Sequence, residues 1–266
     1  MSKLELLANV LEYIEQHITE EIHTDDIAEA CYCSRSNLEK LFRFATHISV
    51  RDYIIRRRMT KAGATLVNQP DLSILDVAVM YGYSSHEAFT RAFRQVWNLL
   101  PSEYRSKKRA SELYPRLLPT LEKGDDLMTT RIKFDISELY DIFKSRQDCW
   151  FICADINQLI PINNISRKAG DLAIIESMKR LDDVAEENDI VFRIGGDEFV
   201  ILTDSPDETK AKVKMDKILS RNGESIDFED QKIPLSLYVC TVKLEKDPHH
   251  YGELFTALWK AICESK

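Results

Sequence analysis

Residues 74–94 decide the fold of the first half of the chain: Ile-Leu-Asp-Val-Ala-Val-Met-Tyr-Gly-Tyr-Ser-Ser-His-Glu-Ala-Phe-Thr-Arg-Ala-Phe-Arg. Apolar residues recur at helical spacing on both sides of Gly82, which predicts a short helix, a tight turn and a second helix ending near Val96. Ser84 or Ser85 can cap the second helix, because a serine oxygen accepts from free amides of a first turn. The stretch therefore predicts a helix-turn-helix.

The same pattern occurs roughly 50 residues earlier, over residues 25–44, which makes it an internal repeat. Thr24 and Ser34 are the expected caps there, and the acidic residues after Thr24 suit a first helical turn. A long helix from about Val50 to Val67 is expected between the two motifs, because its apolar positions keep a helical period. The first half is thus predicted to be all-α.

The second helix of each motif presents polar side chains on its outer face. In the first motif these are Arg35, Ser36, Asn37, Glu39 and Lys40, and in the second they are Ser85, His86, Glu87, Thr90, Arg91 and Arg94. An α-helix fits the DNA major groove, and Arg, Asn, Ser and Thr side chains read base edges or hold phosphates. We therefore expect both helices to bind a double-stranded DNA operator.

The distribution of charge supports this expectation, although the net charge of −8 alone would argue against nucleic acid. Residues 35–109 contain 14 Lys and Arg against 6 Asp and Glu, whereas residues 111–266 contain 21 against 30. Such asymmetry is typical of a chain in which one half approaches phosphate and the other does not. A dipolar surface without a nucleic-acid partner is the alternative.

Residues 5–105 resemble the DNA-binding domain of the AraC/XylS family. The resemblance is carried by residues 27–30, 34, 38–42, 74–78, 82–84, 89–94 and 101–105, with Asn98 standing where the family usually has Gly. It implies a seven-helix domain whose two recognition helices enter successive major grooves. By position it implies that Arg94 meets phosphate and that the base-facing residues are Ser36, Glu39, Lys40, His86, Glu87 and Arg91.

The sequence pattern changes in the second half of the chain. We expect residues 1–110 to form the DNA-binding domain, residues 111–130 a Pro-containing linker, and residues 131–266 an α/β domain. Strands are predicted at residues 149–154 and 233–244 and in a hairpin over 190–202, because apolar and β-branched residues run together there. Helices are predicted at 169–184, 206–220 and 251–263.

Arg193-Ile-Gly-Gly-Asp-Glu-Phe199 resembles the signature of GGDEF domains, which in their active form condense two GTP into cyclic di-GMP. The resemblance implies a nucleotide-cyclase-type sheet with flanking helices, and a Mg²⁺ site formed by Asp155, Asp197 and Glu198. It further implies that Asn163 and Asp171 contact guanine, and that Gly195 and Gly196 let GTP or a related guanine nucleotide approach the turn.

Several positions depart from the family pattern. Ile160 and Ile262 replace two phosphate-binding lysines, and Tyr238 replaces the Gly of a Ser-Ile-Gly strand motif. An inhibitory Arg-x-x-Asp motif reads Glu186-Glu-Asn-Asp189. Phosphoryl transfer needs positive charge on the developing oxyanions, so we assign no catalytic residue and expect a domain that binds nucleotide without acting as an enzyme.

Three functional hypotheses follow, and all include DNA binding. The second half is a nucleotide sensor that changes operator affinity, or an active diguanylate cyclase, or a module that only dimerises. A second copy of the chain and RNA polymerase are candidate partners. The sequence has no run long and apolar enough to span a bilayer and does not open like a signal peptide, so we expect a cytoplasmic bacterial protein without a membrane partner.

Overall fold

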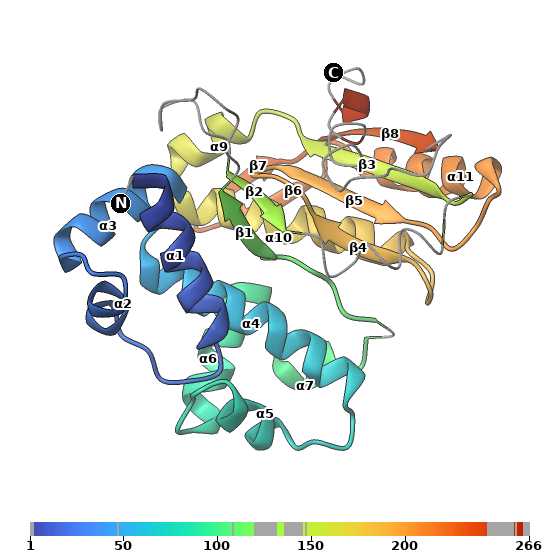
Figure 1. Cartoon of the computed structure of the whole chain (residues 1–266). Helices are drawn as coiled ribbons and strands as arrows, with labels where there is room; N and C mark the ends of the chain where they lie inside the picture. The colour runs from blue at the N-terminus through green and yellow to red at the C-terminus, as the bar shows by residue number, and fades with distance from the viewer. Residues whose placement is uncertain are drawn as a thin grey trace. The chain divides into compact units, whose positions relative to one another are not determined.

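A computed structural model describes residues 3–46, 48–107, 109–119, 132–135, 146, 148–243, 258 and 260–262 (Figure 1). The chain divides into two compact units, the first comprising Met1–Ala110 and Tyr114–Asp135 and the second Ser111–Leu113 and Ile136–Lys266. In the described residues, no helix is both long and apolar enough to cross a membrane. Residues 120–131, which include the whole second half of the predicted linker, lie outside the described residues.

The first unit contains the predicted helices. They are α1 (Lys3–Gln16), α2 (Thr24–Ala30), α3 (Arg35–Thr46), α4 (Val50–Asn68), α5 (Ile74–Met80), α6 (His86–Trp97) and α7 (Pro101–Arg105). Val10, Ile14, Ile27 and Phe42 are fully buried in a core shared by α1, α2, α3 and α4. These helices agree with the prediction that this part of the chain is all-α. The pairs α2–α3 and α5–α6 confirm the two predicted helix-turn-helix motifs.

Serine caps set the beginnings of several helices. Ser34 accepts from the amide of Asn37 at 3.2 Å, and Ser85 accepts from Ala88 at 3.1 Å, as predicted. The prediction that Thr24 caps α2 is wrong, because Thr24 is the first helical residue and His23 precedes the helix. Asp26 does the capping there: its carboxylate accepts from the amide of His23 at 2.7 Å.

The first unit also contains a two-stranded antiparallel sheet that the sequence analysis missed. Its strands are β1 (Arg116–Pro119) and β2 (Ile132–Asp135), with Leu117 paired to Phe134. The amide of Leu117 donates to the hydroxyl of Tyr53 on α4 at 3.2 Å, and burial raises the pKa of Tyr53 to about 12. Strand β1 is therefore fixed to α4 by a buried hydrogen bond.

The residues just before β1 are also bound to α4. The amide of Tyr114 donates to the Thr60 hydroxyl at 3.2 Å, and the guanidinium of Arg57 donates to the Tyr114 carbonyl at 3.4 Å. Arg57 is itself buried and forms a bidentate pair with Glu15 of α1 at 2.9 and 3.1 Å. The Tyr114 carbonyl is thus hydrogen-bonded to a buried ion pair that joins α1 to α4.

The second unit is built on a four-stranded antiparallel sheet in the order β4-β5-β3-β8. Its strands are β3 (Trp150–Ile156), β4 (Ile190–Arg193), β5 (Glu198–Leu202) and β8 (Leu237–Lys243). Its described helices of four or more residues are α9 (Leu159–Ile165), α10 (Arg167–Val184) and α11 (Glu208–Leu219). The predicted α/β class is confirmed, and α9 is an element that the sequence analysis missed.

One predicted strand is corrected. Residues 233–244 were expected to form a single strand, but β8 begins only at Leu237. Residues before it form β7 (Gln231–Pro234), which pairs with β6 (Ser225–Phe228) as a separate hairpin. Pro234 explains the break, since proline has no amide hydrogen to continue a ladder. The predicted helix at 251–263 lies largely outside the described residues; Leu258 and 260–262 are helical.

The two faces of the four-stranded sheet are both covered. Phe151 and Cys153 point to one face, where they cluster with Leu258 and Ile262. Ile152 and Ala154, which alternate with them, point to the opposite face, where α10 and α11 lie (Figure 1). The sheet is therefore buried on both sides, which explains why β3 reads as a continuous apolar run.

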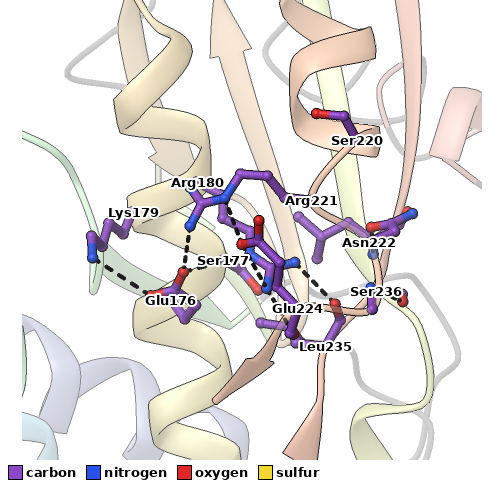
Figure 2. A network of polar contacts seen from close by, with 12 residues as sticks. Glu176, Ser177, Lys179, Arg180, Ser220, Arg221, Asn222, Glu224, Leu235 and Ser236 are labelled. Atoms are coloured by element: carbon purple, nitrogen blue, oxygen red, sulfur yellow. Dashed lines mark hydrogen bonds and ion pairs between the residues drawn. The ribbon is translucent and has the colours of Figure 1, made fainter. Parts of the chain in front are cut away.

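A network of polar contacts fastens the β6–β7 hairpin to α10 (Figure 2). Arg180 of α10 is 1% exposed and donates to the carbonyls of Leu235 at 2.9 Å and Glu224 at 3.1 Å. Arg221 contacts the carboxylates of Glu176 and Glu224, each at 2.9 Å. The Arg180 guanidinium satisfies backbone carbonyls where the chain turns from α11 into β6 and from β7 into β8, whereas the Arg221 guanidinium pairs with carboxylates around it.

The edge of the sheet at β4 is extended by the short segment 111–113. The amide of Glu112 donates to the Val191 carbonyl at 3.2 Å, and the Glu112 carbonyl accepts from Arg193 at 3.1 Å. The hydroxyl of Ser111 donates to the carboxylate of Asp182 on α10 at 2.8 Å. This part of the predicted linker is therefore a bridging strand segment beside the hairpin that carries the Gly-rich turn.

Candidate DNA interface and nucleotide site

The predicted DNA-reading residues of the second motif share one face of α6. His86, Glu87, Arg91 and Arg94 are exposed, while Ser85 is half-buried as the cap. The same face borders a shallow depression of about 540 Å³, lined by His86, Glu87, Thr90, Arg91, Arg94, Gln95 and Leu100. Gln95 and Leu100 were not predicted; Gln95 follows Arg91 by one helical turn, a spacing that could have revealed it.

Thr90 differs from its neighbours on α6. The residue is half-buried, and its hydroxyl oxygen is enclosed without a hydrogen-bond partner in the described part of the chain. Its position one residue after the fully buried Phe89 places it at the border of the helix's core face. The Thr90 hydroxyl is therefore not accessible on the outer face in this structure.

The predicted residues of the first motif lie on α3. Arg35, Ser36, Asn37 and Lys40 are exposed and Glu39 is half-buried. Arg35 donates to the carboxylate of Asp25 on α2 at 2.9 Å, so its charge is partly balanced within the motif. The geometry brings both sets of polar residues to the surface, each on the second helix of its motif.

In the second unit, the strand register places two carboxylates side by side. Asp155 near the end of β3 is the direct partner of Glu198 at the start of β5. Paired residues of antiparallel strands point to the same face with Cβ atoms roughly 5 Å apart. Asp155 is 2% exposed and Glu198 is half-buried, so together they form an acidic position at the strand end.

The Glu198 side chain lies against the first glycine of the turn between β4 and β5. A Cβ on Gly195 would lie 2.2 Å from a carboxylate oxygen of Glu198, whereas a Cβ on Gly196 would meet nothing within 4 Å. The carbonyl of Asp197 accepts from the Ile156 amide at 3.1 Å, which ties the turn to the end of β3. The signature residues are thereby held beside Asp155.

The predicted guanine contacts lie on consecutive helices, Asn163 on α9 and Asp171 on α10. The side-chain oxygen of Asn163 lies so close to Gly170 that a Cβ there would be 1.8 Å from it. Asp171 is the next residue of α10 and is half-buried. The absence of a side chain at position 170 lets the Asn163 amide lie against the first turn of α10.

Three carboxylates, those of Asp155, Asp197 and Glu198, are the candidate groups to hold a Mg²⁺ ion at this strand end. Asp155 and Glu198 are neighbours, and Asp197 is half-buried in the adjoining turn. Among the described residues, no three His, Cys, Asp or Glu side chains are grouped closely enough to hold an ion by themselves. Oxygen ligands from two carboxylates suit Mg²⁺, which ordinarily completes its shell with water and substrate phosphate.

Comparison with known proteins matches both halves of the chain. The family model described as a helix-turn-helix domain matches residues 27–107, and the model described as diguanylate cyclase, GGDEF domain, matches residues 130–266. The chain belongs to the GGDEF family and carries an AraC-type helix-turn-helix domain. It therefore joins a helix-turn-helix domain similar to those of transcription regulators to a GGDEF domain.

Relatives of the AraC-type domain are regulatory proteins. The chain is 32% identical to "Regulatory protein SoxS" of Salmonella typhimurium over 40% of this chain and 99% of that protein. It is 35% identical to "Putative HTH-type transcriptional regulator YkgA" of Escherichia coli over 40% of this chain, and it spans 44% of that relative's length.

Solved structures resemble one half or the other. An AraC-type DNA-binding domain regulator from Chromobacterium violaceum is 30% identical over 38% of this chain and 90% of its own, with a TM-score of 0.37. The diguanylate cyclase SiaD of Pseudomonas aeruginosa, in complex with its activator SiaC, is 14% identical over 48% of this chain and 50% of its own, with a TM-score of 0.42.

The two positions at which the family resemblance predicts lysine carry isoleucine, Ile160 and Ile262. Ile160 is 73% exposed on α9, where an alkyl side chain meets solvent. Ile262 is 1% exposed and belongs to the apolar cluster with Phe151 and Ile194. A lysine at position 160 would place its charge in solvent, whereas a lysine at position 262 would place its charge in the apolar cluster. Position 160 would therefore accept a lysine more easily than position 262.

The GGDEF domain also uses its Asp189 internally. Both carboxylate oxygens are engaged: one accepts from the Asp204 amide at 2.9 Å, and the other contacts Lys214 at 2.5 Å. The side chain of Asp189 is fully buried, and Lys214 is nearly so. An aspartate held in this way serves the packing of α11 beneath the sheet and is not available to a ligand at the surface.

Proposed function

We propose that the protein is a sequence-specific transcription regulator whose GGDEF domain binds a guanine nucleotide with Mg²⁺ as its effector. One observation carries the proposal: Asp155 and Glu198 are paired at the strand end, beside a glycine turn. Asn163, seated against Gly170, supplies an amide that can pair with a guanine edge. Cation, phosphate and base could thus each find a complementary group.

Binding without turnover is the mode that these residues favour. Phosphoryl transfer needs cationic groups on the developing oxyanions, and each typically contributes a few kcal/mol to the transition state. Ile160 and Ile262 supply none. Ground-state binding through one cation and a base contact depends less on those charges. The intact run from Gly195 to Phe199 keeps an active diguanylate cyclase as the second candidate function.

The effect of the nucleotide on DNA can be passed along the chain itself. Glu112 is bonded to β4, which carries one arm of the Gly-rich hairpin, and Tyr114 is bonded to α4 between the two DNA-reading motifs. Only Leu113, which is fully buried, separates them in the sequence. A ligand that shifts β4 would therefore pull on a segment anchored at α4, and its differential affinity for two states sets the size of the effect.

The same proposal includes a second copy of the chain, so that a homodimer binds a repeated DNA site. A homodimer would place two pairs of recognition helices on DNA, and RNA polymerase is a further expected partner of an operator-bound regulator. Dimerisation alone, without nucleotide, is the remaining role for the GGDEF domain. Sedimentation of the protein with and without nucleotide distinguishes a dimer that responds to nucleotide from a dimer that forms independently of nucleotide.

The test is a calorimetric titration of the purified full-length protein with GTP and Mg²⁺. We expect saturable binding without a continuing heat of reaction, and loss of binding in Asp155→Ala. Asp216→Ala, which removes an exposed carboxylate of α11, is the matched control and should bind normally. A continuing heat together with cyclic di-GMP in the product mixture would establish the cyclase instead. Absence of any binding would leave dimerisation.

A further inference from the structure

A tyrosine completes the row of side chains across the acidic strand end. Asp155 of β3 is paired with Glu198 on one side and with Tyr238 of β8 on the other. Because directly paired residues of antiparallel strands share a face, all three side chains point to the same side of the sheet. Tyr238 therefore stands immediately beside the carboxylate that the nucleotide site depends on.

The rows below this one are apolar. The next row along the strands is Val200, Cys153 and Cys240, and it packs into the cluster that contains Leu258 and Ile262. The row of Glu198, Asp155 and Tyr238 lies at the polar border of that cluster. Tyr238 is half-buried, so part of its ring packs and part remains accessible at the strand end.

The backbone that carries Tyr238 is held firmly. The side-chain amide of Asn222 donates to the Leu237 carbonyl at 3.0 Å, and its oxygen accepts from the Leu237 amide at 2.8 Å. The Ser236 hydroxyl accepts from the Gly223 amide at 3.1 Å, within the network of Figure 2. The Ser236 carbonyl accepts from the amide of Asn157, just beyond β3, at 2.9 Å. These bonds fix the start of β8 against the end of β3.

We propose that Tyr238 is a ligand-contacting residue of the nucleotide site, whose hydroxyl donates a hydrogen bond to a phosphate of the guanine nucleotide. The inference rests on the proposed function and deepens it. A tyrosine side chain is longer than an aspartate side chain, so from the position paired with Asp155 its hydroxyl could reach a phosphate held beside that carboxylate. A phenol hydroxyl can donate one hydrogen bond.

This assignment accounts for binding without catalysis at the atomic level. A hydroxyl donor stabilises a phosphate oxygen in the ground state, but it adds no positive charge as the oxyanion develops. Tyr238 would therefore make part of the phosphate contact without supplying the positive charge that is missing at Ile160 and Ile262.

The experiment compares wild type, Tyr238→Phe and Tyr13→Phe for binding of GTP, GDP and guanosine in the presence of Mg²⁺. Tyr238→Phe keeps the ring and removes only the hydroxyl, and Tyr13→Phe, on a half-exposed tyrosine of α1, is the matched control. A hydrogen bond to a charged group predicts an affinity loss of about tenfold for GTP and GDP and none for guanosine.

The outcomes separate the two proposals. If wild type binds GTP and GDP but Tyr238→Phe binds all three ligands as wild type does, only the assignment of Tyr238 is overturned. An equal loss for guanosine, or a gain in nucleotide affinity, also overturns it, since the hydroxyl would then act on the fold or obstruct the site. If wild type binds neither nucleotide, the proposed function and this inference fall together.

Discussion

Tyr32 and Gly82 occupy the same backbone position in the turns of the two helix-turn-helix motifs. Both have positive φ angles, 53° and 77° respectively. The bond that follows them is also shared, because Cys33 donates to Ala28 and Tyr83 donates to Ala78, each at 2.9 Å. The left-handed conformation suits glycine and strains a residue with a side chain, so the first turn carries strain that the second avoids.

We predict that Tyr32→Gly stabilises the first unit by about 1 kcal/mol, because the side chain that opposes the left-handed conformation is removed. Tyr32 is 93% exposed, so almost no packing is lost. Thermal unfolding of the full-length protein is the measurement. Gly82→Ala is the reverse control and should destabilise by about as much, since it adds a Cβ at positive φ. A less stable Tyr32→Gly variant would show that the ring makes a contact that the structure lacks.

The fold of the first unit could be predicted because its signals are local. Gly82, the serine caps and the apolar period fix each helix within a few residues. Strand β1 escaped prediction because its partners, Tyr53 and the β2 strand, are distant in sequence. Thr24 was misplaced by one residue because Asp26 can cap the same helix with its own carboxylate. Competition between neighbouring caps is not resolved by residue type alone.

Arg91→Ala is expected to weaken binding to a selected operator by about 10- to 100-fold at physiological salt, because Arg91 lies exposed at the centre of the outer face of α6 and a bidentate base contact contributes about 1–3 kcal/mol. Fluorescence anisotropy with a duplex selected from a randomised library gives the affinity. Lys217→Ala, an exposed cation of α11, should change nothing. Equal operator affinity for Arg91→Ala and wild type would refute the assignment of α6 as a recognition helix.

Arg180→Ala should lower the stability of the GGDEF domain by about 3–5 kcal/mol, because it strands buried carbonyls and a carboxylate that now have a charged donor. Arg221→Ala, whose side chain is 25% exposed, should cost only about 1 kcal/mol. Urea unfolding followed by tryptophan fluorescence reports the difference. Similar losses for the two variants would contradict the central role of Arg180 in fastening the β6–β7 hairpin.

Acid should weaken the first unit through Glu15. Burial raises the pKa of this carboxyl, but hydrogen bonds and charge from Arg57 and Lys61 outweigh burial and hold the pKa below its ordinary value of 4.5. The stabilisation from the pair is therefore complete above pH 4.5 and is lost as the pH falls through the folded-state pKa. Unfolding free energies between pH 7 and 3 should converge for wild type and Glu15→Gln. A constant difference would contradict the ion pair.

The candidate nucleotide site was only partly predictable from sequence. The signature and Asp155 stand out as residue types, yet their pairing with Tyr238 depends on the register of β8, which the sequence placed in one long strand with β7. The burial of Ile262 also required the structure, because an isoleucine near a helix end reads equally as surface or core. Strand register is set by contacts between residues distant in the chain, so single-sequence patterns leave it open.

The central claim is that nucleotide bound to the GGDEF domain changes operator affinity, and an anisotropy titration of the selected operator with and without saturating GTP and Mg²⁺ tests it most directly. We expect the dissociation constant of wild type to change by about 5-fold or more, the usual size of coupling between sites. The dissociation constant of Asp155→Ala should be the same under both conditions. Identical operator affinities for wild type, with nucleotide binding verified by calorimetry, would contradict the account.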